Sequence, residues 1–185
     1  MKILYKKSYL ILIWLLHIIA CNEPSIEKYR IPKNVSKTFV GEEANSSKIG
    51  WEKPESWLKS SGSKMRLASY NVPSKSGYAD LSVMILSGAG GGIEANINRW
   101  RAQIGLPPQK IVDINNSAKS RTCQLGIYKM FDIINPNNTD MAFLCSVIPN
   151  GDNTIFVKLS AIPNEINEIK PDFFKFCDSF KLDYE

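Results

Sequence analysis

The chain has 185 residues, with 23 Lys and Arg against 18 Asp and Glu, and one histidine. Without residues 1–20, whose removal we expect, 20 Lys and Arg face the 18 acids and no histidine is left. This composition excludes Ser-His-Asp and Cys-His catalytic pairs and removes the commonest zinc ligand, so we expect no metal and no cofactor. The basic residues form no stripe, so nucleic acid is not an expected partner. Nucleotide is not expected either, because no Gly-Lys-Ser/Thr sequence of a phosphate-binding loop is present.

Residues 1–20 have the pattern of a secretory signal, because three lysines precede a short apolar run that ends in a small residue. That run is too short for a transmembrane helix, which needs about 20 apolar residues. The sequence "IIAC" at its end resembles the bacterial lipobox, which implies cleavage before Cys21 and acylation of its thiol. Multiple acyl chains would give a stable membrane anchor. The alternatives are an ordinary signal peptide and an uncleaved anchor.

Three regions follow from this processing. Residues 1–20 are the predicted lipoprotein signal peptide, and residues 21–48 are polar, without a sustained period, and read as a flexible tether. Residues 49–185 are long enough for a single domain with a sizeable core. Asn22 stands where an Asp would resemble an inner-membrane retention signal. We therefore expect a protein anchored in the cell envelope, at the periplasmic side of the outer membrane.

The first predicted elements of the domain are a hairpin and a helix. Trp51 and Trp57 flank a proline and are expected at the edge of the core. Alternating apolar residues predict strands at 65–72 and 78–86, joined by a turn cluster. A helix then follows at 93–104, with an apolar stripe that faces the core and a terminating glycine. The stripe is Ile93, Ile97, Trp100 and Ile104, and the glycine is Gly105.

The second half of the domain contains more hairpins. Residues 109–119 form a loop or a short helix, and strands are expected at 122–134, 141–149 and 154–162. A last helix at 170–180 would direct an apolar face inward, made of Phe173, Phe176, Cys177 and Phe180. Because hairpins dominate, the sequence predicts an α+β fold with a mostly antiparallel sheet flanked by helices.

A glycine run, Gly90-Gly91-Gly92, lies between the second strand and the first helix. With the residues after it, the run matches a dinucleotide-binding pattern, and Asp113 lies near the expected place of a ribose-binding acid. We reject that interpretation because the later strands form hairpins rather than βαβ units, and because Glu94 would repel a pyrophosphate. We expect instead that the glycines allow positive φ and close packing at the entry to the helix.

The three later cysteines show no CxxC spacing, which excludes a metal knuckle or a redox motif. An oxidising envelope would allow one disulfide among Cys123, Cys145 and Cys177, with one thiol left over. Cys145 and Cys177 lie within apolar runs, so we expect both to be small buried hydrophobic residues.

Several stretches together resemble a family of bacterial envelope lipoproteins. They are "GWEKPESW", "MRLASY", "ILSGAGGGIEANINRWRAQIGLPP", "TIFVKLSAIP" and "FFKFCDSFKL". The central pattern is N-x-N-R-W-R-x-Q-x-G-L-P-P, and the likeness covers most of residues 50–182. More distantly, the order of elements is similar to the PsbP-like fold, which the envelope lipoprotein DcrB shares. The resemblance implies an antiparallel sheet flanked by helices and no particular activity.

The helix at 93–104 carries the residues that we expect to bind a ligand. Its polar faces can offer forked and amide hydrogen bonds to a small anionic ligand or to an envelope protein. They consist of Asn96, Asn98, Arg99, Arg101 and Gln103. Alternatively, Asn96 or Asn98 bonds the glycine loop, and one arginine pairs with Glu94 or Asp80. The predicted function is a lipid-anchored, non-enzymatic binding or assembly module; the alternative is a hydrolase that uses carboxylates or a Ser/Lys pair.

Overall fold

The computed structural model of this chain describes residues 48–88 and 92–183. The predicted signal peptide, Cys21, nearly all of the predicted tether, and Gly90 and Gly91 lie outside the described residues. In the described ranges, no helix is long and apolar enough to cross a membrane.

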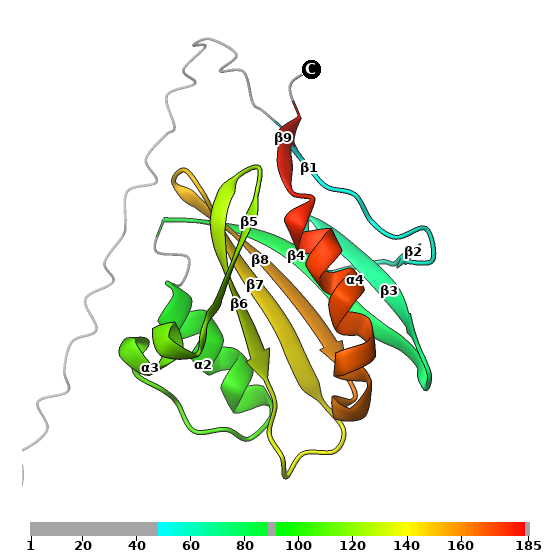
Figure 1. The fold of residues 1–185 in the computed structure, drawn as a ribbon, viewed down its shortest axis with the longest axis vertical. Coiled ribbons are helices and arrows are strands. Elements are labelled where there is room, and N and C mark those ends of the chain that lie inside the picture. Colours follow the sequence, from blue (N-terminus) through cyan, green and yellow to red (C-terminus); the bar gives the residue numbers. More distant parts are fainter. Residues whose placement is uncertain (1–47, 89–91, 184–185) are drawn as a thin grey trace, which may run out of the picture. The chain divides into compact units, whose positions relative to one another are not determined.

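An antiparallel sheet of seven strands forms the centre of the described structure, with the strand order β2-β3-β4-β8-β7-β6-β5 (Figure 1). Adjacent strands are mostly joined by hairpins, but β4 and β8 pair although they lie far apart in the sequence. The strands are β2 (Leu58–Lys59), β3 (Ala68–Ser74), β4 (Gly77–Ser87), β5 (Lys119–Cys123), β6 (Gly126–Ile133), β7 (Ala142–Asn150) and β8 (Asn153–Ala161).

Two further strands, β1 (Lys48–Gly50) and β9 (Lys181–Asp183), pair with each other in a separate antiparallel ribbon. Trp51 follows β1 and stacks on Phe180, with the ring centroids 5.2 Å apart. Trp57 is almost fully buried against Tyr70 and Phe176. Trp51 therefore lies at the edge of the core, as the sequence predicts, whereas Trp57 lies within the core.

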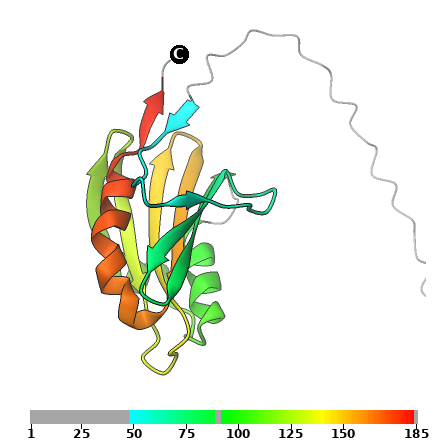
Figure 2. The ribbon, with the colours of Figure 1, turned by 90° about the vertical axis from the view of Figure 1, so that its right-hand side faces the viewer.

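Helices cover both faces of the sheet. Figure 2 shows α4 (Ile166–Asp178) on one side and α2 (Ile93–Gln103) on the other. A short 3-10 helix, η1 (Pro163–Glu165), leads into α4, and α3 (Ile111–Ser117) lies beside α2. The predicted inward face of the last helix is confirmed for Phe173, Phe176 and Cys177, which lie on α4 and are fully buried. Phe180 is fully buried as well, but it follows the end of the helix.

A second hydrophobic core lies between α2, α3 and the opposite face of the sheet. Ile97, Trp100 and Ile104 are each at most 3% exposed, and Trp100 meets Phe156 edge to face. Phe143 and Phe156 contribute from the sheet. Since β7 is buried on both faces, its sequence is an almost continuous apolar run. The predicted α+β fold with a mostly antiparallel sheet and flanking helices is thus confirmed.

Three expectations about the elements are corrected. The region 122–134 is not one strand but two, β5 and β6, because the chain reverses just before Gly126, where φ is +122°. The last helix begins at Ile166 rather than at Lys170 and ends at Asp178 rather than at Phe180, and Pro171 lies inside it. The short strands β1, β2 and β9 are additional to the predicted order.

The two ends of α2 explain its glycines differently. Gly105 has φ +75°. The Gly105 N–H donates to the carbonyl of Ala102 and the Leu106 N–H donates to the carbonyl of Arg101, as in a Schellman motif. The C-terminal prediction is therefore confirmed. At the other end Gly92 has φ −50°, and an added Cβ would meet no atom within 4 Å. The prediction that this glycine needs positive φ and close packing is therefore wrong for Gly92.

Candidate functional site

The polar residues of α2 are used largely within the protein. Asn98 Nδ2 donates to the carbonyl of Gln109 at 2.9 Å, and Asn98 Oδ1 accepts from the Gln109 N–H at 2.8 Å. Arg101 Nε donates to the carbonyl of Pro107 at 2.9 Å. These bonds fasten the proline-containing segment after α2 against the helix. Much of the motif around Trp100 therefore has a structural explanation.

The other three predicted site residues separate into two groups. Asn96 is buried, and its Nδ2 donates to the carbonyl of Gly92, so the alternative that it bonds the glycine loop is confirmed. Its Oδ1 accepts from Arg99 Nη1 at 3.0 Å. Gln103 lies at the end of α2 and accepts a hydrogen bond from Lys158 Nζ on β8 at 3.2 Å. Gln103 thus contacts the sheet surface around Lys158, which the pattern of the helix alone does not indicate.

The register of three adjacent strands gathers polar side chains next to Gln103. Ser82 lies opposite Ser69 on β3 and Lys158 on β8, and Asp80 lies opposite Asn71 and Ser160. Paired residues in an antiparallel sheet point to the same face, and residues two apart share it. We call this surface the polar face; it consists of Ser69, Asn71, Asp80, Ser82, Lys158 and Ser160.

The polar face continues the sheet surface that α2 covers. On β7, Cys145 lies opposite Lys158 and Phe143 lies opposite Ser160, and both belong to the core beneath α2. The same face of the sheet is therefore apolar under the helix and polar beyond it. Within the polar face, the polar residues of β3, β4 and β8 alternate with apolar residues such as Tyr70, Leu81 and Leu159, which point to the main core on the other side of the sheet. This alternation could have located the polar face once the strand pairing was known.

Lys158 has an unusual environment on the polar face. Its ammonium lies 4.6 Å from the centre of the Phe143 ring, and the amide oxygen of Gln103 is its hydrogen-bond acceptor. Among the described residues, no carboxylate lies within ion-pair distance of Lys158. Burial lowers the pKa of Lys158 below its usual value and the Arg66 guanidinium adds to this, while Cys145 and the Asp80 carboxylate act in the opposite direction. Lys158 is thus a half-buried cation that forms no ion pair with the described residues, and the Asp80 carboxylate that acts on it is bound by Arg66.

Arg66 supports the polar face from a loop. Its guanidinium binds both carboxylate oxygens of Asp80, at 2.8 and 2.9 Å, and Nη1 also reaches the hydroxyl of Ser69. Gly62 approaches that hydroxyl so closely that an added Cβ would lie 2.2 Å from it. The predicted pairing of an α2 arginine with Asp80 is wrong, because Arg66 takes that carboxylate.

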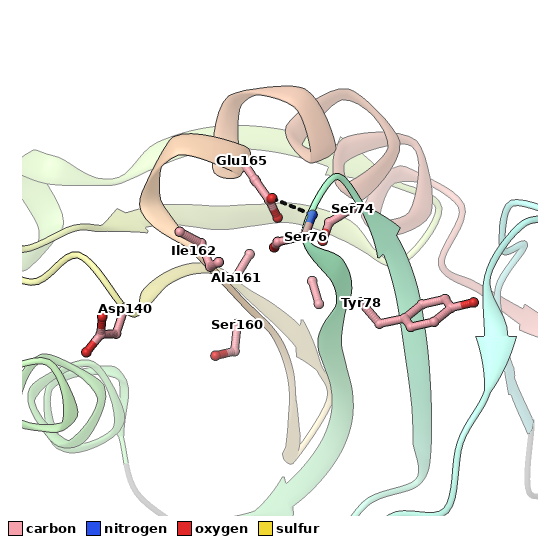
Figure 3. A pocket seen from close by; sticks show the side chains of 9 residues that line it. Ser74, Ser76, Tyr78, Asp140, Ser160, Ala161, Ile162 and Glu165 are labelled. Atoms are coloured by element: carbon pink, nitrogen blue, oxygen red, sulfur yellow. Dashed lines mark hydrogen bonds between the residues drawn. The ribbon is translucent and has the colours of Figure 1, made fainter.

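A second candidate site is a pocket of about 280 Å³ at the end of β8, with Asp140 and Glu165 in its lining (Figure 3). Glu165 accepts a hydrogen bond from the backbone N–H of Ser76 at 2.8 Å. Hydrogen bonds from Ser74 and Ser76 lower the pKa of Glu165. Asp140 lies across the pocket with its carboxylate turned away from Glu165. The two acids therefore do not converge, and Glu165 fastens the β3–β4 turn.

Two ion clusters tie β5 and β6 to α4. Arg121 on β5 holds Asp178 at the end of α4, and Asp132 Oδ2 accepts from Lys119 Nζ at 2.6 Å and from Lys170 Nζ at 2.5 Å. Each carboxylate faces its own basic partners, so these clusters read as links between elements. In the ranges 48–88 and 92–183, no group of His, Cys, Asp and Glu is arranged to hold a metal ion.

The described cysteines are all free thiols, so the structure forms no disulfide among them. Cys145 and Cys177 are fully buried, as expected from their apolar surroundings. Burial raises the pKa of each of these two thiols. Neither is a reactive nucleophile in this state.

Comparison with known proteins gives no matching family model and no matching curated protein. Solved structures give distant likenesses. A crystal structure from Bacteroides thetaiotaomicron VPI-5482 aligns at 9% identity with a TM-score of 0.45, over 74% of this chain and 46% of that one. This chain therefore spans less than half the length of the Bacteroides protein.

Two other solved structures are similar at the same level. Cyanobacterial PsbP (CyanoP) from Synechocystis sp. PCC 6803 has 14% identity and a TM-score of 0.46, over 77% of this chain and 97% of that one. LpqN, involved in cell envelope biogenesis of Mycobacterium tuberculosis, has 13% identity and a TM-score of 0.42, over 72% and 82%.

Proposed function

We propose that this chain is a lipid-anchored binding module of the cell envelope, which holds an anionic group on its polar face. The observation that carries the proposal is the state of Lys158, a half-buried ammonium that forms no ion pair among the described residues, since the Asp80 carboxylate near it is bound by Arg66. A buried charge is costly unless it is paired. A carboxylate or phosphate on Lys158 would supply the missing charge.

The neighbours of Lys158 suit such a ligand. The side chain of Ser160 lies on the same face and is partly exposed, so its hydroxyl can donate to an oxyanion. Gln103 can rotate its amide so that the NH₂ group also donates. Asp80, the acid of the polar face, is neutralised by Arg66 and so repels an anion less than a free carboxylate would. A charge-assisted hydrogen bond from lysine is stronger than a neutral one.

The anchoring part of the proposal rests on the N-terminal sequence. Lipidation of Cys21 would hold the domain at the membrane, and the tether would let it reach ligands or envelope proteins nearby. We retain the outer membrane as the proposed location. Mass spectrometry of the purified protein tests this part, because an acylated Cys21 at the N-terminus has a characteristic mass. A bare Cys21 that follows residues 1–20 would overturn it.

The α2 residues remain part of the proposal in a reduced role. Gln103 contacts Lys158 directly, whereas Arg99 keeps donor groups for a ligand besides the one that binds Asn96. Replacing both Arg99 and Arg101 with alanine tests whether this face captures a partner. Unchanged partners in pull-downs from intact envelopes would limit binding to the polar face.

The alternative is a hydrolase with a Ser/Lys pair, and the lowered pKa of Lys158 beside two serines is the observation that favours it. Such a pair needs a hydrogen bond between the base and the nucleophile. Ser82 instead donates to the backbone carbonyl of Lys158 at 3.4 Å and is buried. Among the described residues, the acceptor of the Lys158 ammonium is Gln103. Binding is therefore the better-supported function.

Native mass spectrometry of the chain purified from its own envelope tests the binding proposal. We expect an anionic species to copurify with the wild type and to be lost from Lys158→Met. Lys129→Met is the matched control, because Lys129 is also half-buried and also binds an amide oxygen, that of Asn115 at 2.7 Å. Equal loss in both variants would contradict the proposal. Ester hydrolysis that disappears in Ser160→Ala would indicate the hydrolase instead.

A further inference from the structure

Residues 58–67, which we call the docking loop, present large apolar side chains to solvent. Leu58 is 51% exposed, Met65 is 71% exposed and Leu67 is 53% exposed. The loop begins with β2 at the edge of the sheet, and Figure 2 shows it projecting beyond β3. Three large apolar side chains are thus exposed within ten residues of one loop, and exposed apolar side chains that gather in one place mark interaction sites.

The docking loop is fixed to the sheet, so this exposure is not a result of a loose segment. The Ser60 N–H donates to the carbonyl of Ser69 at 2.9 Å, and the Leu67 N–H donates to the carbonyl of Val83 at 2.8 Å. The Arg66 guanidinium holds Asp80 with two hydrogen bonds. The apolar side chains are therefore held in place before any partner arrives.

The charge of the docking loop selects the kind of partner. The sequence "LKSSGSKMRL" contains three basic residues and no acid. Arg66 is neutralised by Asp80, while Lys59 and Lys64 are exposed and have no ion-pair partner among the described residues. Apolar side chains flanked by free lysines match the interface of an anionic bilayer. An apolar protein groove would not require the lysines.

We propose that the docking loop lies in the headgroup region of an anionic membrane, with Leu58, Met65 and Leu67 inserted between the lipids. The inference rests on the anchoring part of the proposed function, because an anchored Cys21 keeps the domain near a bilayer. The 26 residues between Cys21 and Lys48 can span up to about 90 Å when extended. The loop can therefore reach the surface to which the chain is attached.

A spin label on the loop tests this docking. The protein, processed as the cell makes it, is reconstituted into vesicles of phosphatidylethanolamine and phosphatidylglycerol and labelled at Met65→Cys in a Cys123→Ser background. Cys145 and Cys177 are fully buried and should not react. The control label is at Ile127→Cys, because Ile127 is 69% exposed and lies on β6, away from the loop. The readout is the accessibility of each label to oxygen relative to a water-soluble nickel chelate.

We expect this ratio to be several-fold higher at position 65 than at position 127, and to fall toward the control value in vesicles of phosphatidylcholine. Lys59→Glu with Lys64→Glu should lower it as well, since each lysine near an anionic surface contributes roughly a fivefold change in partition. Equal ratios at positions 65 and 127 would overturn the proposal. Dipolar broadening between labels at position 65 would also overturn it, in favour of a second copy of the chain. The mass of Cys21, read in the same sample, shows separately whether the anchor is present.

Discussion

Arg121 on β5 grips both carboxylate oxygens of Asp178 at the end of α4, with Nε at 3.0 Å from Oδ1 and Nη2 at 2.5 Å from Oδ2. The Tyr128 hydroxyl donates to the same Oδ1 at 2.6 Å. Burial raises the pKa of Asp178, but the hydrogen bonds from Arg121 and Tyr128 outweigh it and hold the pKa below its usual value. The pair joins β5, at the edge of the sheet, to the end of α4.

Asp178→Asn should destabilise the fold by about 1–2 kcal/mol at neutral pH, because it removes the charge while both donors remain. The pKa is lowered in the folded state, so the carboxylate stabilises the protein above its unfolded pKa of about 3.9. This contribution is lost as the pH falls through the lower folded value. Urea unfolding across acid pH checks the prediction. Asp172→Asn is the control, because Asp172 forms only an exposed pair with Lys175. If the difference in the free energy of unfolding between the wild type and Asp178→Asn stays constant in acid, the prediction is wrong.

Lys158→Met should stabilise the protein by about 1 kcal/mol at neutral pH, because it removes a half-buried charge that forms no ion pair with the described residues. The folded pKa of Lys158 lies below the unfolded value of about 10.4, so the unfolded chain binds more protons between the two values. Wild-type stability should therefore rise across this alkaline window, and the difference from the variant should shrink. Thermal unfolding as a function of pH measures this. A destabilised Lys158→Met would show that the residue serves the fold and not a ligand.

Substitutions at the two ends of α2 should act in opposite directions. Gly92→Ser should stabilise the helix by about 0.3 kcal/mol, because Gly92 is the N-cap, forms no side-chain cap and has space for a Cβ, while glycine is already a tolerated N-cap residue. Gly105→Ala should cost about 1–2 kcal/mol, because φ is +75° there. The atom nearest to that added Cβ would be Asn135 Nδ2 at 3.6 Å, so backbone strain and not a clash sets the cost. Equilibrium denaturation of both variants provides the test, and destabilisation by Gly92→Ser would refute the capping argument.

Asn98→Ala should destabilise the protein by about 1–2 kcal/mol, because it leaves the N–H and carbonyl of Gln109 without their partner. The segment 107–110 should then exchange its amide hydrogens faster. Arg99→Ala is the neighbouring control and should stay within about 0.5 kcal/mol of the wild type, since Arg99 is exposed. Hydrogen exchange together with chemical denaturation separates the two. Equal destabilisation by Asn98→Ala and Arg99→Ala would show that the hydrogen bonds of Asn98 to Gln109 do not stabilise the protein.

Local periodicity predicts much of this fold. The apolar stripe of α2 and its end at Gly105 follow from residue spacing, and the hairpins follow from alternation and turn residues. The predicted start of α4 is too late, because proline usually occupies the first turn of a helix and Pro171 therefore suggests a start at Lys170. Here Ile166 and Ile169 are buried against the core, and their burial outweighs the roughly 3 kcal/mol that an interior proline costs.

The polar face could not be predicted from local patterns. Ser82 and Lys158 are 76 residues apart in the sequence and become neighbours only through the pairing of β4 with β8. Alternation shows that each strand has a polar side, but it does not show which strands lie together or in what register. The helix residues suggested a ligand because arginine and asparagine are versatile donors. In the structure, Asn98 and Arg101 bond the backbone of their own chain.

The pairing of β1 with β9 has a mechanical consequence. Glu52 and Ser179 reinforce this ribbon, since the Glu52 N–H donates to Ser179 Oγ at 2.8 Å and that hydroxyl reaches back to the Glu52 carbonyl. A pulling force that enters the domain through Lys48 would therefore load the ribbon and the end of α4 before it reaches the seven-stranded sheet. The three residue pairs of the ribbon would separate first. The ribbon would thus yield under tension while the seven-stranded sheet and its cores stay folded.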